Sequence, residues 1–236
     1  MNALVLVTLL ARMHDPGLTV AQRNDACYAL RGVNTPAVVE AMRKALDEQP
    51  VRACAGINLR AIAAIPELTD ALGDSDPQVR ALAVRQLGAF EKPELLATLA
   101  AAARDSQLIV AANAVEGLAD YRDPVVIPYL LDIAKMGGIP GAAALNRALE
   151  FRDSRVPAVA RALLDRPDVS DKLAGMRALA QMGDASDLPR LKEIARTETQ
   201  AVAAQNRGFG LMPPISLSKA ALTTIDAIEK HRPAIQ

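Results

Sequence analysis

One short segment, residues 74–88, recurs along the whole chain, and this repetition constrains the fold more than any other feature. The segment predicts a turn followed by one helix, because Asp76 can cap a helix and Pro77 fits its first position. Gly88 supplies a stop signal at the other end. Between these signals the apolar residues follow helical spacing, at Val79, Ala83 and Leu87.

The position of Leu87 has six equivalents, separated by 28 to 33 residues except at a longer last step. These equivalents are Leu30, Leu59, Leu118, Leu149, Met182 and Ile225. A small residue precedes six of the seven positions by four residues, and Leu145 is the exception. Matching first helices are predicted at residues 3–13, 36–48, 65–73, 94–104, 124–136, 157–165 and 187–196. Because one helical hairpin cannot bury both of its faces, we expect about seven stacked hairpins in a single all-α domain, 1–236.

The repeated segment resembles the second helix of a HEAT repeat, of the short kind found in phycobilin-lyase subunits. The resemblance implies a right-handed α-solenoid, with first helices outside and second helices on the concave side. Arg23, Arg52 and Arg80 occupy the arginine of the HEAT pattern. In HEAT repeats this arginine commonly ties the helix start to an acidic group in the adjacent turn. The later units lack it, so the first half of the chain fits the pattern better.

Composition and charge agree with packed short helices and exclude other classes. Hydrophobic residues make up 51% of the chain but aromatic residues only 3%, which argues against a β-sandwich. The formal net charge is zero, so no global field attracts nucleic acid or an anionic membrane, and neither partner is expected.

The two cysteines, Cys27 and Cys54, form no Cys-x-x-Cys pair, and both fall inside predicted helices. A free cysteine in such a place is usually a small buried apolar residue. We therefore expect free thiols, a reducing compartment and a cytoplasmic location.

No catalytic residue, metal site or cofactor is predicted, so a binding module is favoured over an enzyme. His14 and His231 stand at opposite ends of the chain without a cluster of metal ligands. Deoxyhypusine hydroxylase, a HEAT-type enzyme, binds iron through repeated His-Glu pairs, and the absence of such a pair here excludes that activity. Contact between His14 and Cys27 is conceivable, but a surface histidine and a buried thiol are the favoured interpretation.

The helical spacing also predicts which side chains line the concave face. Ala81, Leu82 and Arg85 project from their helix toward that face. The equivalent positions of the other repeats continue a stripe along the face, and this stripe is acidic at one end and basic at the other. Such a stripe suits an extended peptide or a helix of mixed charge, although ordinary solvated positions would give the same pattern. The predicted partner-binding residues are Asp25, Tyr28, Arg85, Asn113, Glu116, Arg147 and Arg177.

Two further segments are candidates for contacts. A long loop, residues 197–214, intrudes into the last repeat, and it is either a partner contact or a tolerated insertion. Its candidate contact residues are Arg207, Phe209 and Met212. Residues 3–11 are nearly unbroken apolar and are predicted to form the first helix. Something must cover this helix, either a neighbouring chain through self-association or a further segment.

The leading functional hypothesis is a non-catalytic scaffold that binds a protein partner on its concave face. One alternative is a phycobilin-lyase-like enzyme or chaperone that acts on a tetrapyrrole-bearing protein. Another is a nucleic-acid-binding HEAT-like module. The repeat pattern by itself specifies a fold and not a reaction.

Overall fold

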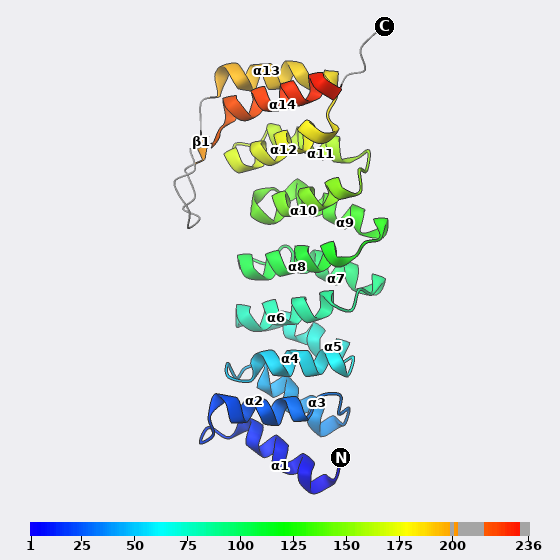
Figure 1. The fold of residues 1–236 in the computed structure, drawn as a ribbon, viewed down its shortest axis with the longest axis vertical. Coiled ribbons are helices and arrows are strands. Elements are labelled where there is room, and N and C mark those ends of the chain that lie inside the picture. Colours follow the sequence, from blue (N-terminus) through cyan, green and yellow to red (C-terminus); the bar gives the residue numbers. More distant parts are fainter. Residues whose placement is uncertain (199–200, 203–214, 232–236) are drawn as a thin grey trace. The chain divides into compact units, whose positions relative to one another are not determined.

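The computed structural model describes residues 1–198, 201–202 and 215–231 (Figure 1). These residues form fourteen α-helices and one pair of two-residue strands. The chain divides into two compact units, Met1–Tyr121 and Arg122–Gln236, which are described separately below. Within the described part of the chain, no helix combines the length and the apolar character needed to cross a membrane.

The first unit consists of four helical hairpins. Its helices are α1 (Ala3–His14), α2 (Val20–Ala29), α3 (Pro36–Ala45), α4 (Arg52–Ala61), α5 (Ile65–Asp70), α6 (Pro77–Gly88), α7 (Leu96–Ala102) and α8 (Leu108–Asp120). Short 3-10 turns at Ala71–Gly73 and Pro93–Leu95 adjoin α5 and α7. Within this unit the even-numbered helices stack on one another in one row (Figure 1).

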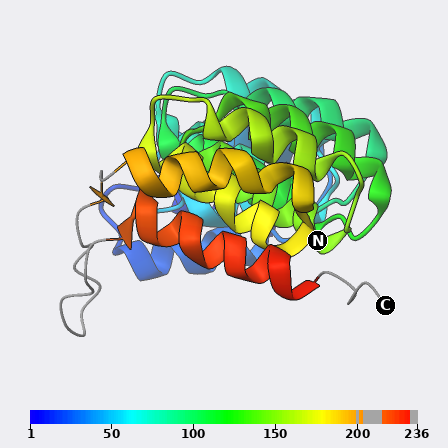
Figure 2. The same ribbon diagram turned by 90° about the horizontal axis from the view of Figure 1, so that it is seen from above.

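The second unit contributes three more hairpins. Its helices are α9 (Ile127–Met136), α10 (Gly138–Glu150), α11 (Val156–Leu164), α12 (Val169–Met182), α13 (Leu188–Thr197) and α14 (Leu217–His231). In Figure 2, α13 and α14 are the orange and red helices that lie side by side. The prediction of an all-α chain of seven helical hairpins is confirmed for the described residues, with four hairpins in the first unit and three in the second. The right-handed sense and the single domain over 1–236 stay predictions.

The long loop of the last repeat starts and ends at a short antiparallel pair. Strand β1 (Ala201–Val202) pairs with strand β2 (Ile215–Ser216), with Ala201 opposite Ser216. The predicted contact residues of this loop, Arg207, Phe209 and Met212, lie outside the described residues.

Local sequence signals explain where several of these helices begin. Thr19 caps α2 in a capping box with Gln22, and the Asp76 carboxylate accepts the Gln78 N–H at 2.8 Å at the start of α6. Proline follows the cap in α3 and α6. Helices of six to fifteen residues are marginal in isolation, so their stability comes chiefly from packing between neighbours.

The core lies where the repeat pattern predicts it. The equivalents of Leu87 in the first unit, Leu30, Leu59 and Leu118, are fully buried. The small residues four positions earlier are also buried, and they are Ala26, Ala55, Ala83 and Ala114.

Helices α6 and α8 approach each other closely at a pair of glycines. A Cβ atom added to Gly88 would lie 2.7 Å from the Cα atom of Gly117, so the two backbones touch. Only residues without a side chain allow this contact. It fixes the spacing of α6 and α8.

One repeat position was assigned wrongly from the sequence. Met182 is only half-buried, whereas Leu179, one turn earlier in α12, is fully buried. Four residues before Leu179 stands Gly175, where an added Cβ would lie 2.6 Å from the Ala160 carbonyl oxygen. Lys172 then takes the place of the HEAT arginine and pairs with Glu198. The pattern of small residues had pointed to Ala178 because alanine and glycine both satisfy it.

The prediction of free thiols is also wrong. Cys27 and Cys54 form a disulfide that joins α2 to α4, with their Cα atoms 6.3 Å apart. Both residues are fully buried, as expected. Their separation of 27 residues is close to one repeat, so stacking brings them together. The separation of the two cysteines in residues does not by itself reveal this pairing. It becomes visible when the separation is compared with the length of one repeat.

We expect the disulfide to stabilise the first unit by about 3–4 kcal/mol, because it closes a loop of 27 residues in the unfolded chain. Denaturant unfolding with and without a dithiol reductant measures this difference. The double variant Cys27→Ala, Cys54→Ala serves as the control, since its unfolding should not respond to the reductant. Two titratable thiols in the unfolded, unreduced protein would contradict the assignment.

We expect Gly88→Ala to lower the free energy of unfolding by about 1–3 kcal/mol, because the new methyl group overlaps the backbone at Gly117. Thermal or denaturant unfolding measures the loss. Gly73→Ala is the matched control, since an added Cβ there meets nothing within 4 Å. Equal stability of the two variants would show that α6 and α8 can separate freely.

Candidate functional site

Three ion pairs tie the even-numbered helices of the first unit together. The pairs are Arg23 with Glu48, Arg52 with Asp76 at 2.7 Å, and Arg80 with Asp105 at 2.7 Å. In each pair the arginine starts one even-numbered helix and the acid stands in the turn before the next. The predicted tie between helix start and adjacent turn is therefore confirmed in these three repeats.

Each of these arginines also donates to a backbone carbonyl of its own hairpin, at the end of the first helix or in the turn that follows it. Arg23 Nε donates to the Met13 oxygen at 2.9 Å, and Arg52 Nε donates to the Leu46 oxygen at 2.6 Å. Arg80 reaches the Asp74 oxygen at 2.8 Å. One guanidinium thus links two successive hairpins, because its planar fork offers several donors in fixed directions.

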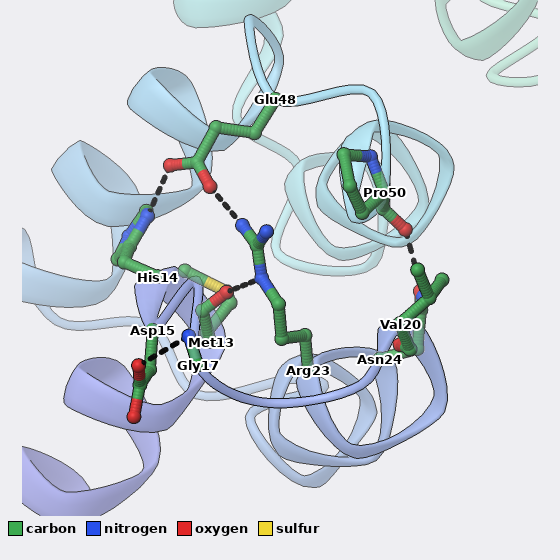
Figure 3. Close-up of polar contacts among 9 residues, drawn as sticks. All are labelled: Met13, His14, Asp15, Gly17, Val20, Arg23, Asn24, Glu48 and Pro50. Atoms are coloured by element: carbon green, nitrogen blue, oxygen red, sulfur yellow. Dashed lines mark hydrogen bonds and ion pairs between the residues drawn. The ribbon is translucent and has the colours of Figure 1, made fainter.

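The first of these links includes a histidine that the sequence did not connect to it. Figure 3 shows the Glu48 carboxylate between His14 Nδ1 and the Arg23 guanidinium, one contact to each oxygen. Beside it, the Asn24 side-chain amide donates to the Pro50 carbonyl oxygen at 2.7 Å. His14 and Glu48 are 34 residues apart, so only the stacking of hairpins brings them together. Glu48 therefore joins the end of α1, the start of α2 and the turn before α4.

This cluster does not contain a nucleophile. The sulfur of Cys27 is bonded to Cys54, so the conceivable pair of His14 with a free Cys27 thiol is not formed. Across the described ranges, no group of three or more His, Cys, Asp or Glu side chains could hold a metal ion.

A hollow of about 510 Å³ opens on the face formed by α4, α6 and α8, and we call it the α6 groove. The α6 groove lies within the first unit, and one of the three linking arginines, Arg52, is among its lining residues. The residues that line it are Gln49, Arg52, Ala53, Gln78, Ala81, Leu82, Arg85, Ile109 and Asn113.

The apolar part of the α6 groove depends on a glycine. A Cβ added to Gly56 of α4 would lie 2.9 Å from the Leu82 side chain, so Leu82 of α6 lies directly against the α4 backbone. Ala81 is buried beneath it, while Ile109 is 46% exposed. The groove is therefore shallow and apolar between its polar side chains.

The polar part of the α6 groove consists of two guanidinium groups and three amides. Arg52 is engaged by Asp76, whereas exposed Arg85 has no ion-pair partner among the described residues. The Asn113 amide donates to the Ala81 carbonyl oxygen at 3.0 Å, which fixes its position. Arg85 therefore offers an uncompensated positive charge beside fixed hydrogen-bonding groups.

Two of the predicted partner-binding residues, Arg85 and Asn113, come together in the α6 groove. Glu116 is exposed on α8, one turn beyond Asn113, and Tyr28 is 46% exposed on α2. Asp25 lines a different hollow, beside α1.

The other two predicted residues, Arg147 and Arg177, are exposed on α10 and α12 of the second unit. Arg147 pairs with Glu150 at 3.0 Å on the same helix.

The predicted concave stripe missed several residues of the α6 groove, because the prediction followed only three positions per helix. Gln78 stands three residues before Ala81 and therefore shares its face, so a wider helical window would have found it. Gln49 lies in a turn and Ile109 in a first helical turn, where repeat spacing varies.

Residues 65–138 match a family model described as HEAT repeats, which confirms the predicted resemblance for that part of the chain. The more specific likeness to repeats of the phycobilin-lyase kind stays a prediction. No curated protein matches this chain.

Several solved structures are similar to this chain at low identity. Human deoxyhypusine hydroxylase in complex with glycerol is 18% identical, with a TM-score of 0.40 over 96% of each chain. A designed armadillo repeat protein is 14% identical, with a TM-score of 0.38 over 94% of this chain and 99% of the other. An engineered protein is 18% identical, with a TM-score of 0.27 over 98% of both chains. At this level of identity and superposition we draw no functional argument from them.

We expect the link between Arg80 and Asp105 to make stability depend on pH in the acid range. The hydrogen bond from Arg80 lowers the pKa of Asp105 below that of the unfolded chain, about 3.9. The stabilisation is therefore fully present above that value and is lost as the pH falls through the folded-state pKa. The melting temperature of Asp105→Asn should lie below wild type at neutral pH, and the gap should shrink in acid.

Asp132→Asn is the control for this experiment, because the pair of Asp132 with Lys135 is exposed and contributes little. Its melting temperature should follow wild type at every pH. A constant gap between Asp105→Asn and wild type, from neutral pH into acid, would contradict the role assigned to the carboxylate.

Proposed function

We propose that this chain is a protein-interaction module and that its α6 groove binds a short segment of a partner protein. The match to HEAT repeats supports the general role, since such repeats commonly serve as scaffolds for other proteins. The general role follows from the fold by analogy, so the particular site has to be argued from its own side chains.

The observation that carries the proposal is the exposed Arg85 guanidinium beside an apolar floor. Because Arg85 has no ion-pair partner in the described part of the chain, it is available to a carboxylate on a ligand, which an arginine binds through two parallel hydrogen bonds. The floor at Ala53, Ala81 and Leu82 accepts small apolar side chains. The groove thus favours a segment with one acidic residue next to small apolar ones.

The amides of the α6 groove suit an extended backbone. Gln49, Gln78 and Asn113 each carry both a donor and an acceptor, so they can pair with the main chain of a peptide whatever its side chains are. Glu116, one turn beyond Asn113 on α8, would favour a basic residue at one end of that segment.

We propose neither the bilin-related alternative nor the nucleic-acid alternative. Recognition of a nucleic acid draws on several cations and on aromatic stacking platforms. The α6 groove has one uncompensated arginine and no aromatic lining residue.

Selection from a random peptide library displayed on phage tests the proposal. We expect the wild-type chain to enrich peptides that combine an acidic residue with small apolar residues. Arg85→Glu should weaken binding of the selected peptides by about tenfold or more, the loss typical of a charge-assisted hydrogen bond. Binding is measured by fluorescence anisotropy with a synthetic peptide of the selected sequence.

Arg43→Glu is the matched control, because Arg43 is an exposed arginine on α3 of the same unit and lies outside the α6 groove. It should bind the selected peptides as wild type does. Equal losses of peptide affinity in both variants would show that the effect comes from net charge alone. Wild-type affinity of Arg85→Glu for the selected peptides would show that the α6 groove is not the binding site.

A further inference from the structure

Helix α1 presents an apolar surface that no element of the first unit covers. It carries seven large apolar side chains, and only Met13 is buried. Leu4 is 73% exposed and Val7 is 63% exposed. Helix α1 packs against α2 (Figure 1), yet most of its side chains stay exposed.

The exposed side of α1 is hollowed where it meets α2. The hollow has a volume of about 370 Å³, and we call its lining the α1 face. The lining residues are Leu4, Val5, Thr8, Leu9, Arg12, Asp25 and Ala26. This surface is separate from the α6 groove, which is lined by residues of α4, α6, α8 and the turn before α4.

The charges on the α1 face identify its occupant. Arg12 and Asp25 are both exposed, and neither has an ion-pair partner within the described ranges. Arg12 and Asp25 line the same apolar hollow, so a second copy of this surface can offer the opposite charge to each of them. An anionic lipid surface would instead favour a rim of cations.

We propose that a second copy of the chain covers the α1 face in a two-fold dimer. A two-fold axis brings the same patch from both copies together, so each contact occurs twice. Arg12 of each copy then meets Asp25 of the other, beside the packed apolar side chains. The exposed side chains Leu4 and Val5 become buried at the centre.

Sedimentation velocity of the full chain at rising protein concentration tests this arrangement. We expect a species of twice the mass of one chain. The double variant Leu4→Glu, Val5→Glu should stay a monomer with unchanged helical circular dichroism, since both side chains are exposed in the single chain. Leu222→Glu is the matched control, because Leu222 is 58% exposed on α14, and this variant should dimerise as wild type does.

A charge swap tests the pairing across the two-fold axis. Arg12→Glu and Asp25→Arg should each raise the dimer dissociation constant by about tenfold, because each places like charges opposite one another. The combined variant Arg12→Glu, Asp25→Arg should restore wild-type dimerisation. If Arg12 and Asp25 paired within one chain, the combined variant would not restore the dimer.

A wild-type chain that remains monomeric at every concentration would overturn the proposal. So would a dimer that persists in Leu4→Glu, Val5→Glu, since the interface would then lie elsewhere. A combined charge variant that fails to recover dimerisation would refute the pairing of Arg12 with Asp25.

Discussion

The first unit depends on a link in which one arginine bridges two hairpins. Short helices cannot hold their own positions in water, and apolar stacking alone would let neighbouring hairpins slide or rotate. The guanidinium removes that freedom because it holds a carbonyl of its own turn and an acid of the next turn at once. The even-numbered helices are thereby placed in a row, and the α6 groove is the surface that results.

The sequence was sufficient for the fold because the repeat leaves its mark at several independent positions. Leu59 and Leu87 predicted the buried rows, and Arg52 and Arg80 predicted the ion pairs. Errors arose where two residue types meet the same requirement. Gly175 and Ala178 are both small enough for a close helix contact, so the pattern could not choose between them, and the register of α12 shifted by one turn.

The candidate site was less predictable than the fold. The helical spacing placed Arg85 and Asn113 on one face, but it could not show that Leu82 would rest on Gly56 and shape an apolar floor. It likewise gave no sign that Glu48 would join His14 to Arg23, because that contact depends on how hairpins stack. The buried rows and the arginine ion pairs were found because the repeat pattern marks them at regular positions. The contacts of Gly56 and Glu48 were not found because no repeated residue type marks them.

The disulfide between α2 and α4 encloses the whole of α3 in a covalent loop. Two consecutive hairpins are consequently joined by sulfur as well as by the main chain. A protease that cuts once between Cys27 and Cys54 would leave both fragments attached under oxidising conditions. The helix pair that carries the α1 face would remain tethered to the rest of the molecule after such a cut.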